Sequence, residues 1–120
     1  MKRKPYFKLF ILLLCSVSLG SCSECGRITF VSPDEVHQAE VVTILIAGSN
    51  TDFRVWENLD VDFIPSNDID LLGECSVITN TELKCEIAIA EDAELGPRTI
   101  VITNGDCIVA KANVLEILEP

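Results

Sequence analysis

Cysteine offers the most chemistry in this 120-residue chain, which contains six of them. Cys25, Cys75, Cys85 and Cys107 form an even set, and an even number of cysteines in a small exported chain is typical of a disulfide framework. A zinc site is the competing interpretation, because cysteine thiolates also bind zinc. The spacing argues against zinc, since the only C-x-x-C begins at Cys22 and the chain has one histidine. We therefore expect two disulfides.

Other catalytic groups are scarce. Nucleophilic catalysis needs a positioned base, and His37, the only imidazole, lies in a predicted loop where we interpret it as exposed. The chain has no G-x-S-x-G, H-E-x-x-H or glycine-rich phosphate-binding motif. Two carboxylates could hydrolyse a glycoside, but among 19 acidic residues some suitably spaced pair is expected by chance. The sequence therefore predicts a protein that is not an enzyme and that binds no cofactor.

A crowded set of oxygen-bearing side chains is the best candidate for a metal site. Calcium binds oxygen ligands of this kind, but the spacing does not follow the D-x-[DN]-x-[DN]-G pattern of an EF-hand loop. A solvated acidic loop is the simpler interpretation, so we predict no metal and keep a calcium site as the weaker alternative. The candidate ligands are Asp60, Asp62, Asn67, Asp68 and Asp70.

The only tryptophan, Trp56, is the weaker candidate for binding a partner. It lies in a loop-like stretch beside Arg54 and Glu57, and an exposed tryptophan there could anchor a protein or stack on a sugar ring. The alternative interpretation is that the indole closes the edge of the fold between strands, and this is the one we favour.

The first 21 residues have the layout of an export signal. Basic residues at 2, 3, 4 and 8 precede an apolar run over 9–15, and small residues then lead to Cys22. The run is much shorter than the ~20 residues that span a bilayer, so we predict no permanent transmembrane helix. Leu19-Gly20-Ser21-Cys22 resembles the lipobox of bacterial lipoproteins, which implies a lipidated Cys22 as the mature N-terminus. Cleavage nearby by an ordinary signal peptidase is the alternative.

Ser23 follows Cys22 where an aspartate would favour retention at the inner membrane. The resemblance to bacterial lipoproteins therefore implies a protein of the cell envelope, anchored at the outer membrane. Without the leader, the chain keeps five basic and 19 acidic residues, a net charge of −14. Nucleic-acid binding requires the opposite sign, because Lys and Arg must neutralise phosphates. The acidity also argues against contact with anionic lipid, so only the acyl chain would tie the protein to the membrane.

Beyond the leader, β-branched and alternating apolar segments are separated by turn signals, and no helical stripe interrupts them. This pattern predicts an all-β fold, an immunoglobulin-like antiparallel β-sandwich of seven to eight strands preceded by a signal-peptide helix. Asn104-Gly105 is the strongest hairpin signal. We expect a signal peptide at 1–21, a tether at 22–26 and one domain at 27–120. The predicted strands cover 27–32, 41–47, 61–64, 69–72, 75–79, 83–90, 98–103 and 113–118.

Alternation within the strands predicts the disulfide pairing. Residues 83, 85, 87 and 89 share one face of their strand, and a hairpin centred on Asn80 places Cys75 directly opposite Cys85. We therefore expect a Cys75–Cys85 disulfide. The remaining pair, Cys25–Cys107, would tie the N-terminal strand to the start of the last one.

Several segments resemble the IPT/TIG type of immunoglobulin-like domain. The likeness covers about residues 27–118 and rests on spaced apolar, glycine and turn positions. Such domains often begin with a "v-x-P" strand end, as in 31–33, and continue with a long strand into G-x-N/T-x-F, as in 42–53. Residues 81–87 and 93–105 match the later strands. The sequence departs from the pattern at 33–36 and in its four cysteines.

This resemblance implies an accessory role, since such domains serve as spacers or binding modules. We expect a non-catalytic, surface-tethered module for protein or glycan interaction or for structural scaffolding, whose partner the sequence does not identify. The alternative is a calcium-stabilised or carbohydrate-binding adhesion domain that uses the acidic 60–70 segment and Trp56.

Overall fold

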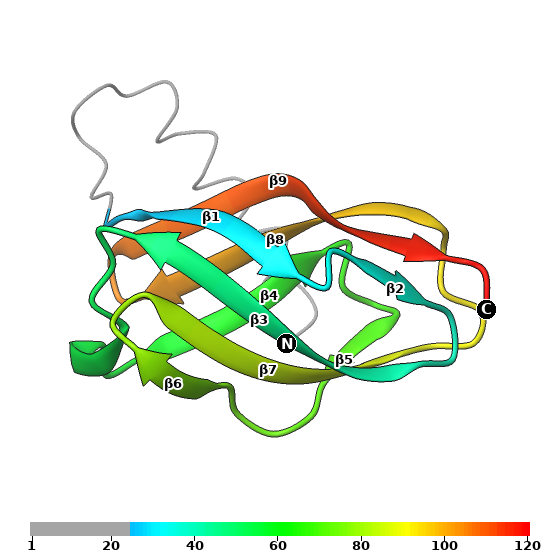
Figure 1. Cartoon of the computed structure of the whole chain (residues 1–120), viewed down its shortest axis with the longest axis horizontal. Coiled ribbons are helices and arrows are strands. Elements are labelled where there is room, and N and C mark those ends of the chain that lie inside the picture. The colour runs from blue at the N-terminus through cyan, green and yellow to red at the C-terminus, as the bar shows by residue number, and fades with distance from the viewer. Residues whose placement is uncertain (1–24) are drawn as a thin grey trace.

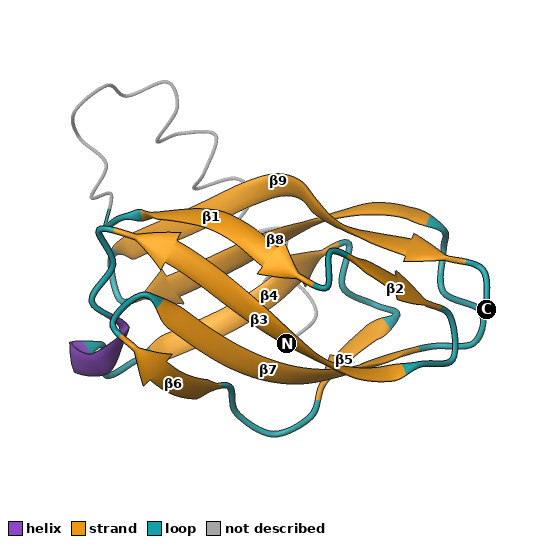
Figure 2. Ribbon diagram, viewed as in Figure 1, coloured by secondary structure: helices purple, strands orange, loops and turns teal. Residues whose placement is uncertain are grey.

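The structure is a computed structural model that describes residues 25–120. The predicted signal peptide, Cys22 and most of the tether therefore lie outside the described residues. The described part is built from strands, with a single 3-10 turn and no α-helix (Figure 2). The elements are β1 (Arg27–Ser32), β2 (Glu35–His37), β3 (Val41–Ser49), η1 (Phe53–Val55), β4 (Leu59–Ile64), β5 (Ile69–Leu71), β6 (Ser76–Thr79), β7 (Glu82–Ile89), β8 (Gly96–Asn104) and β9 (Cys107–Leu118).

The strands form two facing sheets (Figure 1). One sheet has the order β1-β3-β7-β5, and β6 shares with β5 the outer edge of β7. The other has the order β2-β9-β8-β4. In chain order this matches the immunoglobulin arrangement, in which strands A, B, E and D face strands C, F and G. The predicted all-β sandwich of immunoglobulin-like type is confirmed.

One strand escaped prediction. After Ser32 the chain leaves the first sheet, and β2 joins the second sheet in parallel to β9, with Val36 opposite Ile117. The strand has only three residues, and its flanks are polar, so it shows none of the alternation that identifies longer strands. Val36 is nevertheless fully buried. His37 consequently ends a strand and does not lie in a loop, which corrects the prediction.

The last strand is longer than predicted. It begins at Cys107, because the hairpin with β8 aligns Cys107 with Asn104. The missed half includes Ala110, Lys111 and Ala112, residue types of low strand propensity. The two central residues of the turn are Gly105 and Asp106, and Gly105 supplies the positive φ of 60° that the tight turn needs.

The core lies between the sheets and contains the residues that alternation selects. Leu83, Cys85, Ile87 and Ile89 all point inward from β7 and are buried, as predicted. Ile44 and Ile46 of the neighbouring strand β3 lie beside them in the same sheet, and Ile100 and Ile102 of β8 face them from the opposite sheet. Each such side chain contributes roughly 1.5–3 kcal/mol when buried.

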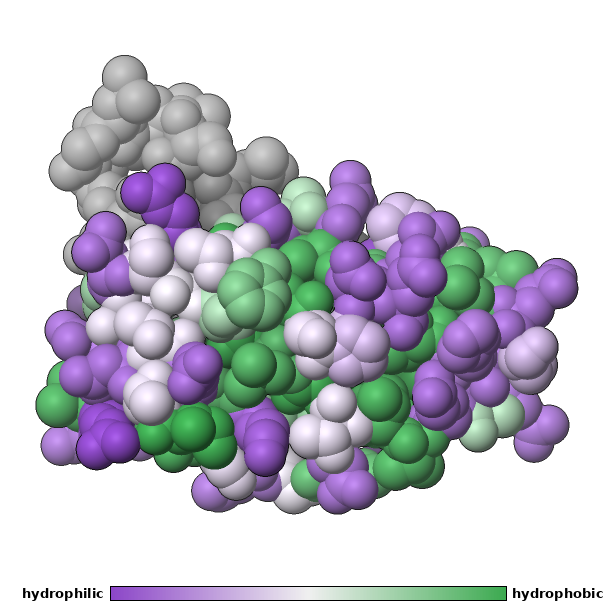
Figure 3. Space-filling model, in the orientation of Figure 1, coloured by the Kyte–Doolittle hydropathy of each residue, from purple (hydrophilic) through white to green (hydrophobic). Residues whose placement is uncertain are grey.

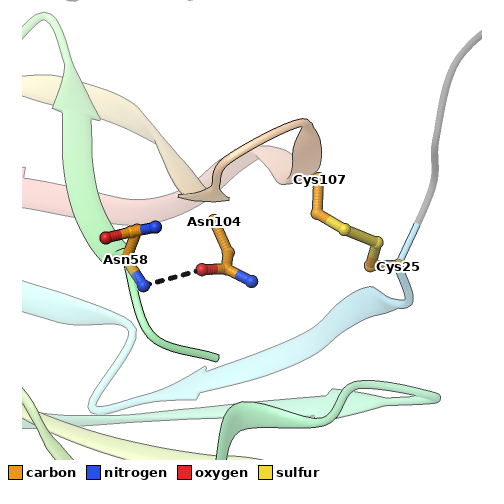
Figure 4. The surroundings of a disulfide bond; sticks show 4 residues. All are labelled: Cys25, Asn58, Asn104 and Cys107. Carbon is orange, nitrogen blue, oxygen red and sulfur yellow. Dashed lines mark hydrogen bonds between the residues drawn. A yellow bond between two sulfur atoms is a disulfide. The ribbon is translucent and has the colours of Figure 1, made fainter. Parts of the chain in front are cut away.

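Two disulfides join the predicted partners. Cys75–Cys85 lies within one sheet, between the start of the β6 hairpin and β7, with a Cα–Cα distance of 4.4 Å. Cys25–Cys107 has a Cα–Cα distance of 5.6 Å (Figure 4). It connects Cys25, two residues before β1, to Cys107, the first residue of β9 in the opposite sheet. Only the second disulfide therefore ties the two sheets together.

Among residues 25–120, no helix is long and apolar enough to cross a bilayer.

Candidate interaction surface

A cleft opens along one edge of the sandwich, where the two sheets end. The edge strand of one sheet is β4, and the facing edge of the other is shared by β5 and β6. The cleft between them has a volume of about 440 Å³. Its lining consists of Trp56, Glu57, Leu59, Asp60, Val61, Leu71, Gly73, Glu74, Cys75 and Val77. We call this the edge cleft.

Trp56 reaches the edge cleft because the segment before it is held in place. Phe53 in η1 is fully buried, and its ring meets the Trp56 indole edge to face, with centroids 5.2 Å apart. The indole is half-buried, packs against the core and still lines the cleft. Trp56 therefore closes the edge of the sandwich, as favoured from the sequence, while part of it faces the cleft.

The turn between β6 and β7 fastens this segment. The backbone carbonyl of Asn80 accepts hydrogen bonds from the Thr51 hydroxyl at 2.5 Å and from the Phe53 amide at 3.0 Å. The Asn80 side chain accepts a third from the Arg54 amide at 3.0 Å. The cleft wall that carries Trp56 is therefore fixed to the wall that carries β6.

The edge cleft is acidic over an apolar floor. Glu57, Asp60 and Glu74 are among its lining residues, and none of the lining residues is basic. The apolar part is formed by aliphatic side chains of both sheets, mainly Leu59, Val61 and Leu71. The Cys75–Cys85 disulfide forms part of one wall. Such a surface attracts cationic and amphipathic groups and repels anions.

The proposed calcium ligands do not converge. Val61 and Phe63 are the buried residues of β4, so Asp60 and Asp62 project from its opposite face. Asp70 is exposed on β5, which belongs to the other sheet. Asn67 is also exposed, in the connection between these strands. Within residues 25–120, no three His, Cys, Asp or Glu side chains are grouped so that they could hold a metal ion.

Asp68, another of the proposed calcium ligands, forms an ion pair with Arg98. Arg98, which is only 2% exposed, donates to both carboxylate oxygens of Asp68, Nη1 to Oδ1 at 2.5 Å and Nη2 to Oδ2 at 3.0 Å. The guanidinium also donates to the carbonyl oxygens of Pro65 and Glu94. The backbone N–H of Glu94 donates to Asp68 as well. Sequence reasoning missed this pair, because a buried charge cannot be distinguished from an exposed one by residue type.

The surroundings of Asp68 lower the pKa of its carboxyl group. Burial alone would raise the pKa of the carboxyl, since it penalises the charged form. The hydrogen bonds from Arg98 and Glu94 and the positive charge of Arg98 outweigh burial and hold the pKa below its usual value. Asp68 is therefore a structural anion that ties the link before β5 to β8.

The remaining candidates have no neighbours that suggest catalysis. The imidazole of His37 is exposed, and its Nδ1 lies 2.7 Å from the carbonyl oxygen of Glu119. All four cysteines among the described residues are disulfide-bonded, so this part of the chain offers no thiolate. Cys22, the predicted lipidation site, lies outside the described residues.

A second apolar surface covers the outer face of the five-stranded sheet. Figure 3 shows apolar side chains over its middle, bordered by polar ones. Phe30 is 52% exposed and Val41 is 61% exposed on this face. Glu82, Lys84 and Glu86 project from β7, on the other side of β3 from β1. The face has charges of both signs and is not hollowed, so it provides less specific chemistry than the edge cleft.

No protein-family model matches the chain, and no curated protein is significantly similar to it in sequence. Among solved structures, the chain is similar to the BIgI domain of the beta protein from S. agalactiae, determined bound to CEACAM1. The two share 16% identity with a TM-score of 0.41, over 78% of this chain and 96% of that one. The strand order of the two sheets carries the assignment of the immunoglobulin-like fold.

Proposed function

We propose that this protein is a non-catalytic, protein-binding immunoglobulin-like module of the IPT/TIG type, tethered to a membrane of the bacterial cell envelope. The edge cleft with Trp56 is the observation that supports this proposal most strongly. It combines an aromatic ring, an apolar floor and three acidic residues at a sheet edge. Aromatic side chains in such partly enclosed positions are enriched among the residues that dominate protein interfaces.

The polar groups elsewhere support a binding role over a catalytic one. The buried guanidinium of Arg98 pairs with the partly buried carboxylate of Asp68, and the described cysteines are cross-linked. A general base, a nucleophile and a site for the reacting atom should converge in an enzyme. The imidazole of His37 contacts the carbonyl of Glu119, and the backbone amide of His37 donates to the carboxylate of Glu40. These contacts hold the end of β2 in place.

The tether is a separate part of the proposal and rests on the sequence. The export-signal layout and the Leu19-Gly20-Ser21-Cys22 lipobox favour an acyl anchor on Cys22. Ser23 favours the outer membrane. Metabolic labelling with an alkyne fatty acid tests the anchor. The wild-type protein should be labelled and its Cys22→Ser variant should not, whereas an unlabelled wild-type protein would contradict lipidation.

Affinity capture from the membrane fraction of the native cells tests the binding function. A captured protein should then bind the purified full chain saturably in a titration. Glycan-array binding of the same full chain is the second arm, because Trp56 could also stack on a sugar. Saturable binding to a defined protein supports the proposal. Glycan binding without any protein partner, or no saturable binding at all, contradicts it.

A further inference from the structure

We propose that the edge cleft receives an extended, basic segment of a partner protein, with an Arg or Lys side chain held between Trp56 and the carboxylates of Glu57 and Glu74. The inference rests on the proposed function, because it names the surface and the chemistry of the partner. It depends on the position of the cleft, the character of its lining and the rigidity of its walls.

The position favours an extended occupant. β4 pairs with β8 on one side, and among residues 25–120 no further strand pairs with its other side. In immunoglobulin domains of the variable type, additional strands occupy this edge. Here the chain leaves β4 at Ile64 and crosses to β5 in the other sheet. An edge strand beside a cleft suits strand addition, in which backbone hydrogen bonds fix a segment and pockets take its alternate side chains.

The lining favours a cationic side chain. Glu57 and Glu74 are both exposed at the mouth of the cleft, and no lining residue would repel a positive charge. A guanidinium or ammonium group over the Trp56 ring would also gain a cation–π contact. The methylene stems of Arg and Lys can cover apolar surface while the charged head remains near water. The aliphatic floor formed by Leu59, Val61 and Leu71 matches such stems.

The charge distribution disfavours other occupants. A second copy of this chain would present the same acidic lining, and the mature chain carries a net charge of −14. Two such surfaces repel each other. Anionic groups are disfavoured for the same reason. A neutral sugar would use the Trp56 ring but would not need Glu57 and Glu74, so the carboxylates distinguish a glycan from a basic peptide.

Contacts within the chain hold both walls of the edge cleft in place without a partner. Cys75 is linked to Cys85, which is 1% exposed, so the β6 wall is fastened to the buried face of β7. Asn80 fixes the segment that leads to Trp56. A preformed cleft lowers the entropic cost of ordering the binding site. The cleft volume of about 440 Å³ lies within the range of small-ligand pockets and has room for side chains of an extended peptide.

The test uses the only tryptophan as a reporter. The full chain is titrated with a capped decapeptide of alternating Arg and Val, with its Lys–Val counterpart and with a Glu–Val peptide of equal length, while Trp56 fluorescence is followed. We expect a saturable change with the two basic peptides, weaker at high salt, and none with the acidic peptide. The absence of a saturable change with both basic peptides would overturn the inference.

Matched variants separate the cleft from general attraction. Glu57→Gln and Glu74→Gln should each weaken binding of the Arg–Val peptide about two- to fivefold, as for exposed ion pairs. Glu91→Gln and Glu119→Gln, which remove the same charge outside the cleft, should leave it nearly unchanged. Equally weakened peptide binding in all four variants would show that net charge alone attracts the peptide and would overturn the inference.

The natural partner distinguishes this inference from the proposed function. One outcome is that a captured protein binds the Glu57→Gln, Glu74→Gln and Trp56→Ala variants as tightly as the wild type. This result would support the binding function but would overturn the assignment of the partner to the edge cleft. A glycan whose affinity depends on Trp56 but not on the two glutamates would also overturn it.

Discussion

Arg98 and Asp68 form a doubly hydrogen-bonded ion pair between the two sheets, at 2.5 and 3.0 Å. Arg98 lies near the start of β8, whereas Cys107, which follows the end of β8, is disulfide-bonded to Cys25. The sandwich is therefore tied across its layers at both ends of one strand, by charge at one end and by a covalent bond at the other. Between them the isoleucine-rich core fills the interior.

Removal of Asp68 should be costly. Asp68→Ala leaves the guanidinium of Arg98 buried without its counter-charge, and breaking a buried pair in this way costs about 3–5 kcal/mol of folding free energy. Urea unfolding of the oxidised protein measures the loss. Asp70→Ala, at an exposed position, is the control and should change stability by about 0.5 kcal/mol or less. Similar losses for both variants would argue against the ion pair.

The same carboxylate should make stability depend on pH. Because the pKa of Asp68 is lower in the folded protein than in the unfolded chain, its contribution is fully present above the unfolded value of ~3.9. The contribution is lost as the pH falls through the lower folded pKa. We expect the stability difference between wild type and Asp68→Asn to narrow from pH 6 towards pH 2.5. A difference that stays constant or widens in acid would contradict the assigned direction of the shift.

The two disulfides should contribute unequally. The chain-entropy model gives about 4–5 kcal/mol for Cys25–Cys107, with a sequence separation of 82, and about 3 kcal/mol for Cys75–Cys85, with a separation of 10. Paired Cys→Ala variants, compared by denaturant unfolding, test the ranking. A larger loss of folding free energy without Cys75–Cys85 would contradict the ranking and would show that packing around the buried Cys85 outweighs chain entropy.

Asn80 should control the environment of Trp56. Asn80→Ala removes the side-chain acceptor of the Arg54 amide and should cost about 1 kcal/mol. The segment keeps its two bonds to the Asn80 carbonyl but is held less tightly, so the indole should be more exposed and the Trp56 emission maximum should shift to longer wavelength. Asn67→Ala, at an exposed position elsewhere, should leave both quantities unchanged. An unaltered emission spectrum in Asn80→Ala would show that the Asn80 side chain does not control the position of the ring.

Strand positions and cysteine pairing were accessible from the sequence, because β-branched alternation and hairpin symmetry are local signals. The Asn80 turn placed Cys75 opposite Cys85 for this reason. β2 was not accessible, since only Val36 is apolar and its parallel partner lies about 80 residues away in the chain. The Arg98–Asp68 pair and the edge cleft were missed because both arise where segments distant in sequence meet. Trp56 was identified, but its cleft exists only once the sheet edges face each other.

Site-specific photo-crosslinking in native cells tests the central claim most directly. A photoreactive phenylalanine at Val77, which lines the edge cleft and is 41% exposed, is compared with one at Val41, which is 61% exposed on the outer sheet face. The account predicts a defined cross-linked protein from position 77 and none, or much less, from position 41. Cross-linking from position 41 alone, or equally from both, would contradict a partner bound at the edge cleft.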